Sequence, residues 1–358
     1  MKALVKTSSG PGGLELLDLP EPIPGPGQVL LAVRAAALCG TDVHIAHGTV
    51  AVRPPLVLGH ELAGVVAALG PGVSGIRLGA RVTTETDASV CGECAHCVAG
   101  DQHRCPHRTA IGTTSPGGFA EFVAVPAAGV HRLPAHVDFV IGALTEPLAV
   151  AVRAVVERAG VASGEDVVVI GPGTIGLLVA QVAAARGAIV TLAGLSRHEA
   201  RFRLARELGI PRTAMLEVPE DLDAVSRGRD GLGVDTVIDC SGAPDALATG
   251  LRLLRKGGRL VAVGFTGGRT VPLDLDFAVS RELTILASRG KRPRSFTIAV
   301  DLLRRRLVDP GPLVTHRFAL ERWAEAFERA GRSGTKVVLE IEKPPGPSML
   351  ASRRRSST

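Results

Sequence analysis

Apolar and polar positions follow two different patterns along the chain. Over residues 1–148, short apolar runs are separated by turns rich in Gly and Pro, as in Met1–Lys6, Gln28–Ala36 and Glu61–Leu69. Short runs between turn residues are typical of β-strands. This region is therefore predicted to be a β-rich domain with few regular helices.

Residues 149–290 alternate short apolar runs with helical patterns, beginning with a predicted helix over Val150–Ala159. The strands predicted after it are Asp166–Ile170, Ile189–Ala193, Val234–Cys240, Arg259–Val263 and Leu283–Ala287. The helices predicted with them are Thr174–Arg186, Glu199–Leu208 and Pro244–Leu254. Mostly apolar strands that alternate with helices predict a parallel sheet covered on both faces. The region is therefore expected to be a doubly wound α/β domain.

After Gly290 the chain carries a helical pattern over Ser295–Arg306 and a strand pattern over Lys336–Ile341. We expect these elements to complete the first domain, which then comprises residues 1–148 and 291–342. The last residues, 343–358, are rich in Pro, Ser and Arg. They are expected to form a disordered tail.

Composition excludes several classes of protein. The chain is 46% hydrophobic and 21% charged, as in globular proteins. The N-terminus lacks the apolar core of a signal peptide, and Gly, Pro and Arg interrupt the most apolar stretch, Val167–Ala193. Two arginine runs, 304–306 and 353–355, could account for the net charge of +6, and no nucleic-acid module is recognised. We therefore expect a cytoplasmic protein without membrane or nucleic-acid partners.

Residues 171–176 fit the G-x-G-x-x-G turn of dinucleotide-binding domains, because they follow a predicted strand and open a predicted helix. The first glycine would make the tight turn, the second would let the backbone approach the pyrophosphate, and the third would let the helix pack on the sheet. The helix N-terminus would supply N–H groups to the phosphates. The cofactor-binding residues expected here are Gly171, Gly173, Thr174, Ile175 and Gly176.

The residue at the end of the second strand is expected to lie beside the ribose of the cofactor. An NAD site usually carries an acidic residue there, about 20 residues after the turn. Here the strand ends at Gly194, followed closely by Ser196 and Arg197. Gly194 would leave room for a 2′-phosphate that Ser196 and Arg197 could bind, so we expect NADP to be used at least as well as NAD. In the alternative, Glu199 holds the ribose and favours NAD.

Four cysteines fall within fifteen residues, at Cys91, Cys94, Cys97 and Cys105. Spacings of two residues place thiolates on a tight knuckle, and a fourth ligand closes a tetrahedron. Four sulfurs without an open position indicate a structural zinc ion. An iron–sulfur cluster is the main alternative for such a run.

A second set of ligand-type residues is spread along the first domain. It comprises Cys39, His60 and a carboxylate from either Glu61 or Glu146. Catalytic zinc takes about three protein ligands and keeps an open position for water or substrate. Together with the dinucleotide turn, this set predicts a zinc-dependent reaction on a small molecule.

These motifs together resemble the zinc-containing medium-chain alcohol dehydrogenases. The motifs are C-G-T-D-x-H, G-H-E, the four-cysteine lobe at 91–105, G-x-G-x-x-G and E-P-L. The chain is most similar to the sorbitol (iditol) and threonine dehydrogenase branch, which Leu313–Phe318 also supports. The resemblance implies a β-rich GroES-like catalytic domain, a Rossmann domain over 149–290, two zinc ions per chain and NAD or NADP. It further implies hydride transfer from a secondary alcohol of the polyol, sugar alcohol or cyclitol type.

The resemblance also assigns roles to residues. Cys39, His60 and Glu61 would hold the catalytic zinc, and Glu146 would contact it directly or through water. Thr41 would pass on the proton of the alcohol and His44 would relay it to solvent. Asp42 would steady His60. The four cysteines at positions 91, 94, 97 and 105 would hold the structural zinc.

The chain departs from this branch at Gly194, where NAD enzymes usually carry Asp, and over 288–291, where the sorbitol enzymes have an arginine–tyrosine pair. Oxidation of an amino alcohol such as L-threonine is the alternative reaction. A non-enzymatic role on the same scaffold is the alternative class, and the complete ligand sets argue against zinc-free reductases.

Cys240 is expected to serve packing alone. We expect a homo-oligomer, a dimer or tetramer, with Val271–Ala287 pairing two sheets.

Overall fold

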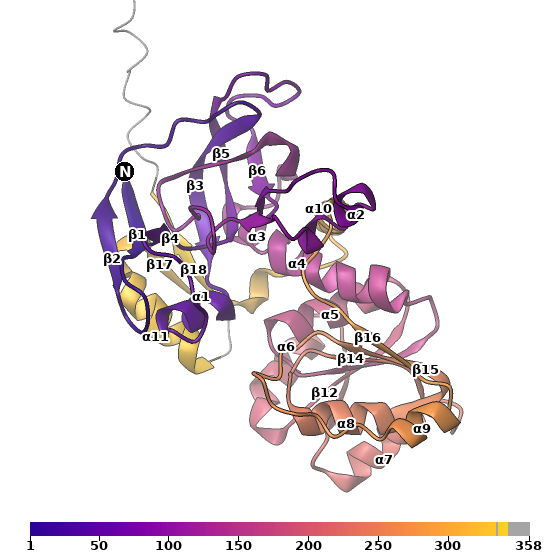
Figure 1. Cartoon of the computed structure of the whole chain (residues 1–358). Coiled ribbons are helices and arrows are strands. Elements are labelled where there is room, and N and C mark those ends of the chain that lie inside the picture. The colour runs from indigo at the N-terminus through magenta and orange to yellow at the C-terminus, as the bar shows by residue number, and fades with distance from the viewer. Residues whose placement is uncertain (334–335, 343–358) are drawn as a thin grey trace, which may run out of the picture. The chain divides into compact units, whose positions relative to one another are not determined.

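The structure is a computed structural model that describes residues 1–333 and 336–342. The described residues divide into two compact units, one formed by Met1–Glu146 together with the described residues from Val314 to Glu342, the other by Pro147–Leu313 (Figure 1). The tail expected over 343–358 lies outside the described residues. Among the helices of the described ranges, none has the length and apolar character needed to traverse a bilayer.

The first unit is rich in β-strands, as predicted. Within its described residues, a seven-stranded sheet has the order β10-β6-β5-β3-β18-β17, with β9 also pairing with β3, and smaller sheets are formed by β2-β1-β4 and β7-β8. The strands are β1 (Lys2–Lys6), β2 (Leu14–Asp18), β3 (Gln28–Ala37), β4 (Leu56–Val57), β5 (Glu61–Leu69), β6 (Arg81–Thr84), β7 (Asp87–Ser89), β8 (Thr109–Ala110), β9 (Phe122–Pro126), β10 (Val130–Arg132), β17 (Val314–Ala319) and β18 (Lys336–Glu340).

Short helices connect the strands of the first unit. They are α1 (Gly40–Ala46), α2 (Ala95–Val98), η1 (Gln102–Arg104), η2 (Ala127–Gly129), α3 (Phe139–Ala143), η6 (Leu320–Arg322) and α11 (Trp323–Ser333). The alternating apolar positions of β3 and β5 are buried in a core that includes Leu31, Val33, Leu62 and Phe119. Val337 of β18 lies in the same core, so the first strands and the last strand of the chain fold together.

The second unit is the predicted doubly wound domain. Its six-stranded sheet has the order β13-β12-β11-β14-β15-β16, and all five pairings are parallel. The strands are β11 (Asp166–Ile170), β12 (Ile189–Gly194), β13 (Arg212–Met215), β14 (Val234–Asp239), β15 (Leu254–Ala262) and β16 (Thr284–Ala287). The order reverses between β11 and β14, and ligands of such sheets bind at the carboxyl ends of the strands at this point.

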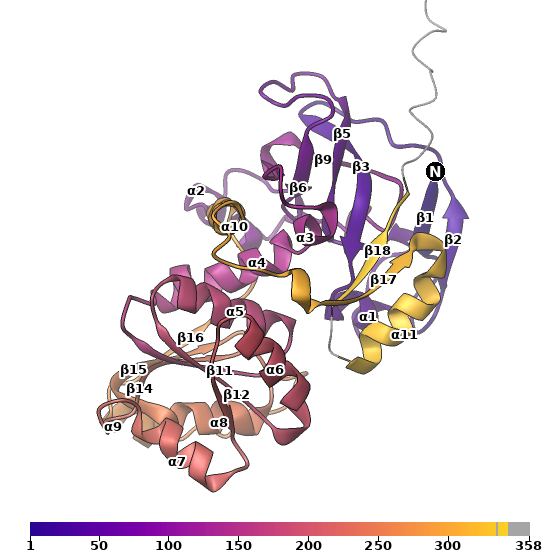
Figure 2. The same cartoon turned by 180° about the vertical axis from the view of Figure 1, so that it is seen from behind.

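Helices cover both faces of this sheet. Figures 1 and 2 show α5 and α6 on one side of it and α7 and α8 on the other. Helix α4 (Thr145–Val152) begins at the boundary between the two units. The helices and helical turns that follow it in the second unit are η3 (Arg153–Ala159), α5 (Thr174–Ala185), η4 (Ser196–His198), α6 (Glu199–Glu207), α7 (Pro219–Arg227), α8 (Pro244–Leu253), α9 (Leu275–Ser280), α10 (Pro293–Arg304) and η5 (Gly311–Leu313).

The second boundary between the units differs from the expected one. The sequence pattern assigned residues 291–342 to the first domain, but α10 belongs to the second unit and the chain returns to the first unit at Val314. Phe296 and Ala299 of α10 are fully buried, and the Ser295 hydroxyl donates a hydrogen bond to Glu157 Oε1 at 2.7 Å. An amphipathic helix does not reveal from its own sequence which core it will cover.

Local elements also differ from the expected pattern. The predicted helix over Val150–Ala159 is the end of α4 followed by a π-helix, η3. The predicted strand at Arg259 begins earlier, at Leu254. The pattern missed β13 and α7, because β13 has only four residues and α7 (PEDLDAVSR) is mostly polar. Short or polar elements form through tertiary packing rather than through their own propensity.

Candidate metal centres and cofactor site

The first ligand set is assembled where β3 and β5 lie side by side. The strands are antiparallel, and Ala37 at the end of β3 pairs with Glu61 at the start of β5. Cys39 follows β3 closely and His60 directly precedes β5, so the register brings both to one edge of the sheet. Cys39, His60 and Glu61 each offer a ligand atom, and these atoms lie within 4.8 Å of one another.

Asp42 of α1 connects two of these ligands. It is fully buried, and its Oδ2 accepts a hydrogen bond from the backbone N–H of Cys39 at 2.8 Å. Its Oδ1 faces Nδ1 of His60 at 3.6 Å, and among the described residues neither atom has a hydrogen-bond partner. A carboxylate behind a histidine ring is the arrangement that orients a metal-bound imidazole.

The electrostatics around His60 fit a bound cation. Burial lowers the pKa of His60, but the negative charges of Asp42 and Cys39 outweigh this effect and raise its pKa to about 10. The neighbours of His60 thus favour positive charge at the imidazole. A zinc ion bound by Cys39, His60 and a carboxylate would supply that charge, and one thiolate, one imidazole and one carboxylate are ligands that zinc accepts.

Lys336 is a site residue that the sequence analysis missed. Its Nζ lies 2.7 Å from Oε1 and 2.5 Å from Oε2 of Glu61, and it donates a hydrogen bond to the Leu38 carbonyl at 3.0 Å. Its strand, β18, runs antiparallel to β3 with Val338 opposite Ala37, which brings the start of β18 next to Cys39. The signal was a lysine opening the apolar strand KVVLE, since a buried lysine needs a partner.

Thr41 and His44 lie three residues apart on α1, so they share one side of the helix. The Thr41 hydroxyl lies 3.7 Å from the Cys39 sulfur. His44 is exposed, and its Nδ1 lies 3.1 Å from the Thr49 hydroxyl. Glu146 is buried in the first turn of α4 but does not belong to the close group of Cys39, His60 and Glu61.

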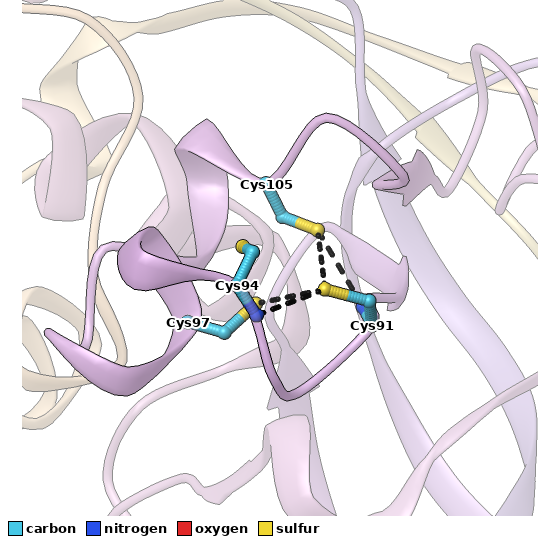
Figure 3. Close-up of side chains that lie close together, drawn as sticks. All are labelled: Cys91, Cys94, Cys97 and Cys105. Atoms are coloured by element: carbon cyan, nitrogen blue, oxygen red, sulfur yellow. Dashed lines mark hydrogen bonds between the residues drawn. The ribbon is translucent and has the colours of Figure 1, made fainter.

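The four cysteines converge in the second ligand set (Figure 3). The Cys91 sulfur lies 3.9 Å from that of Cys97 and 3.6 Å from that of Cys105, and all four sulfurs lie within 4.8 Å of one another. Four sulfurs at about 2.3 Å from a zinc ion are separated by roughly 3.8 Å. The cluster therefore has the dimensions of a tetrahedral zinc site.

The charge state of the cysteines agrees with this interpretation. The backbone N–H groups of Cys94 and Glu93 lower the pKa of Cys91 to about 6, so this sulfur is readily ionised. Burial, together with the neighbouring thiols, raises the pKa of Cys97 to about 12. Four adjacent sulfurs ionise together only around a cation, and four ligands leave no position for a substrate.

The glycine-rich turn has the shape that a dinucleotide requires. Gly171 has φ of +97°, and a Cβ there would lie 2.8 Å from the backbone nitrogen of Ser241 on the neighbouring strand end. A Cβ at Gly176 would lie 1.9 Å from the Gly171 carbonyl, whereas one at Gly173 would meet nothing within 4 Å. The open space at Gly173 lies beside the first turn of α5, Thr174–Ile175–Gly176, where helical N–H groups are free for a pyrophosphate.

The ribose corner at the end of β12 differs from expectation. A Cβ at Gly194 would lie 2.8 Å from Pro172 Cδ and 3.0 Å from His198 Nδ1, so these residues occupy the space that we expected to be open. Ser196 and Arg197 are exposed in the following turn. The corner also contains an acid that the sequence analysis did not consider, because the backbone N–H of Ser196 donates to Glu217 Oε1 at 2.5 Å.

Comparison with known families and proteins agrees with this geometry. Residues 25–135 match the alcohol dehydrogenase GroES-like domain, and residues 174–305 match the zinc-binding dehydrogenase family. A sorbitol dehydrogenase of Halalkalibacterium halodurans is 39% identical over 95% of this chain and 98% of its own. A D-arabitol-phosphate dehydrogenase of Enterococcus avium is 34% identical (96% and 98% covered), and an L-threonine 3-dehydrogenase of Bacillus subtilis is 38% identical (95% and 98%).

Solved structures share the whole fold. A zinc-binding dehydrogenase from Sinorhizobium meliloti, bound to NADP, superposes with a TM-score of 0.87 at 33% identity, covering 95% of this chain and 98% of that one. An alcohol dehydrogenase from Escherichia coli, in complex with NADH, has a TM-score of 0.85 at 28% identity, covering 95% and 99%. The chain therefore belongs to the zinc-binding alcohol dehydrogenases with a GroES-like domain, and it is a zinc-dependent NAD(P) oxidoreductase.

Proposed function

We propose that this dehydrogenase oxidises a secondary alcohol of the polyol, sugar alcohol or cyclitol type. The observation that carries the proposal is the close group of Cys39, His60 and Glu61, which leaves a metal ion with a position for an alcohol. Similarity to sorbitol and arabitol-phosphate dehydrogenases supports the polyol class. Similarity to threonine dehydrogenases makes an amino alcohol the second candidate.

The residues of α1 and α4 would support the reaction around this position. A zinc ion, when bound, lowers the pKa of an alcohol hydroxyl. Thr41, next to Cys39, would accept the proton of the alcohol, and exposed His44 would transfer it to solvent. Asp42 would hold Cys39 and orient His60. Buried Glu146 would contact the metal directly or through water.

The hydride would pass to a nicotinamide cofactor held by the second unit. The first turn of α5 would bind the pyrophosphate, and Gly171, Gly173 and Gly176 would admit it. We propose that NADP is used at least as well as NAD, because Ser196, Arg197 and Arg201 gather donors and positive charge at the ribose corner. Burial lowers the pKa of Arg201, and the positive charge of Arg197 lowers it further. This influence of Arg197 supports the grouping of the two arginines.

The assembly would be a homo-oligomer, either a dimer or a tetramer. Strand β16 ends the sheet order, and its Thr284 and Ile285 are exposed. In α9, shortly before it in the chain, Leu275 and Val279 are 64% and 76% exposed. An apolar edge of this kind pairs readily with a second copy.

The six cysteines are all free thiols, which fits the cytoplasm as the location we propose.

The experiment that tests the reaction is a panel of alcohols with the zinc-loaded protein. Polyols, polyol phosphates, cyclitols and L-threonine are each offered with NAD and with NADP, and formation of the reduced cofactor is followed by absorbance. We expect a polyol or polyol phosphate to give the highest kcat/KM. A higher kcat/KM with L-threonine than with every polyol would overturn the substrate class and leave the zinc-dependent mechanism in place.

A further inference from the structure

Glu217 reaches the ribose corner from the strand next to the expected one. Strands β12 and β13 are parallel, with Gly194 paired to Met215. The backbone N–H of Leu216 continues this pairing by donating to the Gly194 carbonyl at 2.8 Å. Glu217 follows immediately and accepts the backbone N–H of Ser196 at 2.5 Å. The acidic residue of this corner, Glu217, therefore follows β13 and not β12.

Position 194 itself has no space for an acidic side chain. A Cβ there would press against Pro172 of the glycine-rich turn and against His198, whose Nδ1 accepts the backbone N–H of Leu195 at 3.1 Å. An aspartate at 194 would have to displace both neighbours. Position 194 is therefore closed, and Glu217 is the carboxylate that bonds to the backbone N–H of Ser196.

Positive charge lies beside this carboxylate. The hydrogen bond from the Ser196 N–H, and also the charge of Arg197, lower the pKa of Glu217, so it is ionised at neutral pH. Burial and the charges of Arg201 and Arg197 lower the pKa of His198, which leaves the two arginines as the cations of the corner. Glu217 thus occupies a backbone donor close to Arg197, in a corner where Arg201 acts on His198, and backbone donors beside positive charge are the environment that a 2′-phosphate would seek.

We propose that Glu217 is the residue that sets the preference between NAD and NADP. Its carboxylate occupies the Ser196 N–H and repels a 2′-phosphate, whereas it can accept a hydrogen bond from the free ribose hydroxyl of NAD. The arginines favour NADP and Glu217 opposes them. The inference rests on the proposed binding of the cofactor at this corner, and it identifies one side chain as the selector.

The test is a binding measurement that requires no alcohol. NADPH and NADH are titrated into the zinc-loaded protein, and the dissociation constants are obtained from nucleotide fluorescence and calorimetry. Glu217→Gln keeps the size of the side chain and removes its charge. We expect the Kd for NADPH to fall about tenfold and the Kd for NADH to change by less than about threefold. Arg197→Gln should move the NADPH affinity in the opposite direction.

Glu220→Gln is the matched control. Glu220 is exposed in the first turn of α7, three residues further along, and the substitution makes the same change in net charge. It should leave both dissociation constants within twofold of the wild type. If Glu217→Gln leaves the ratio of the NADPH and NADH constants within twofold of the wild type, or if Glu220→Gln shifts it equally, Glu217 is not the selector.

The outcome for the wild type tests the proposed function separately. A wild type that prefers NADH contradicts the proposed use of NADP, but a tenfold shift of the ratio in Glu217→Gln would still establish Glu217 as the selector. A wild type that binds neither nucleotide at millimolar concentration overturns both statements.

Discussion

The two candidate zinc sites of the first unit differ in how far apart in the chain their ligands lie. The four cysteines lie between positions 91 and 105, and their backbone N–H groups donate to one another's sulfurs, as Cys94 does to Cys91 at 3.4 Å. The other set joins the end of β3, the start of β5 and, through Lys336, a strand that begins 275 residues after Glu61. One set is local in the chain, and the other depends on a complete sheet.

This difference separates stability from chemistry. A set of four sulfurs is closed, so a metal ion there supports the surrounding loop and binds no substrate. The set of Cys39, His60 and Glu61 is incomplete by itself, and its carboxylate is already paired with Lys336. Changes at Cys39, His60 or Glu61 should therefore alter the rate, while changes at the four cysteines should alter the stability.

The largest effect is expected from Cys39→Ser. Loss of the thiolate should reduce the zinc content from two ions to one and lower kcat by about 10³-fold or more, because the metal stabilises developing charge by several kcal/mol. Elemental analysis and turnover measure both quantities. The matched control is Cys240→Ser, since Cys240 belongs to neither close group. A variant of Cys39 that keeps two zinc ions and full activity would remove the distinction between the sets.

His44→Ala should slow turnover by about 10²-fold while both zinc ions and the cofactor remain bound, because general acid–base help is typically worth 10²–10⁴-fold. The measurement is kcat across the pH range, with exogenous imidazole added to replace the missing ring. His47→Ala is the control, since His47 is also exposed at the end of α1. An unchanged pH profile in His44→Ala would show that the proton leaves by another route.

Lys336→Met should lower kcat by about tenfold and destabilise the first unit. The substitution removes the lysine partner of the buried Glu61 carboxylate, and breaking a buried ion pair costs about 3–5 kcal/mol. Lys336→Arg should retain most of the wild-type kcat and stability, because it keeps the positive charge. Thermal unfolding and steady-state kinetics are the readouts. Wild-type stability in Lys336→Met would mean that the pair contributes little.

Cys97→Ser should have the smallest effect on the rate and act on stability instead. We expect zinc to fall from two ions to one, Tm to fall by about 5 °C or more, and kcat at 25 °C to stay within about threefold. Elemental analysis, calorimetry and kinetics follow the three changes. Iron at this site, or a loss of rate as large as that of Cys39→Ser, would contradict the comparison.

Much of the molecule could be predicted from the sequence because the information is local. The four cysteines and the turn at 171–176 carry their geometry in their spacing, since a tight knuckle or a strand–turn–helix unit forms from adjacent residues. The parallel sheet of the second unit followed from the alternation of apolar strands with helices, which gave β11, β12 and β14 to within a residue.

Only the tertiary structure decided which distant side chains complete the sites. Lys336 meets Glu61 because β18 pairs with β3, and Glu217 meets Ser196 because β13 pairs with β12. The assignment of α10 to the second unit likewise depends on the core it covers. Strand pairing between separated segments leaves no mark in the spacing of either segment, so the lysine that opens the apolar strand KVVLE indicates that it needs a partner but not which one, and Glu217 indicates neither.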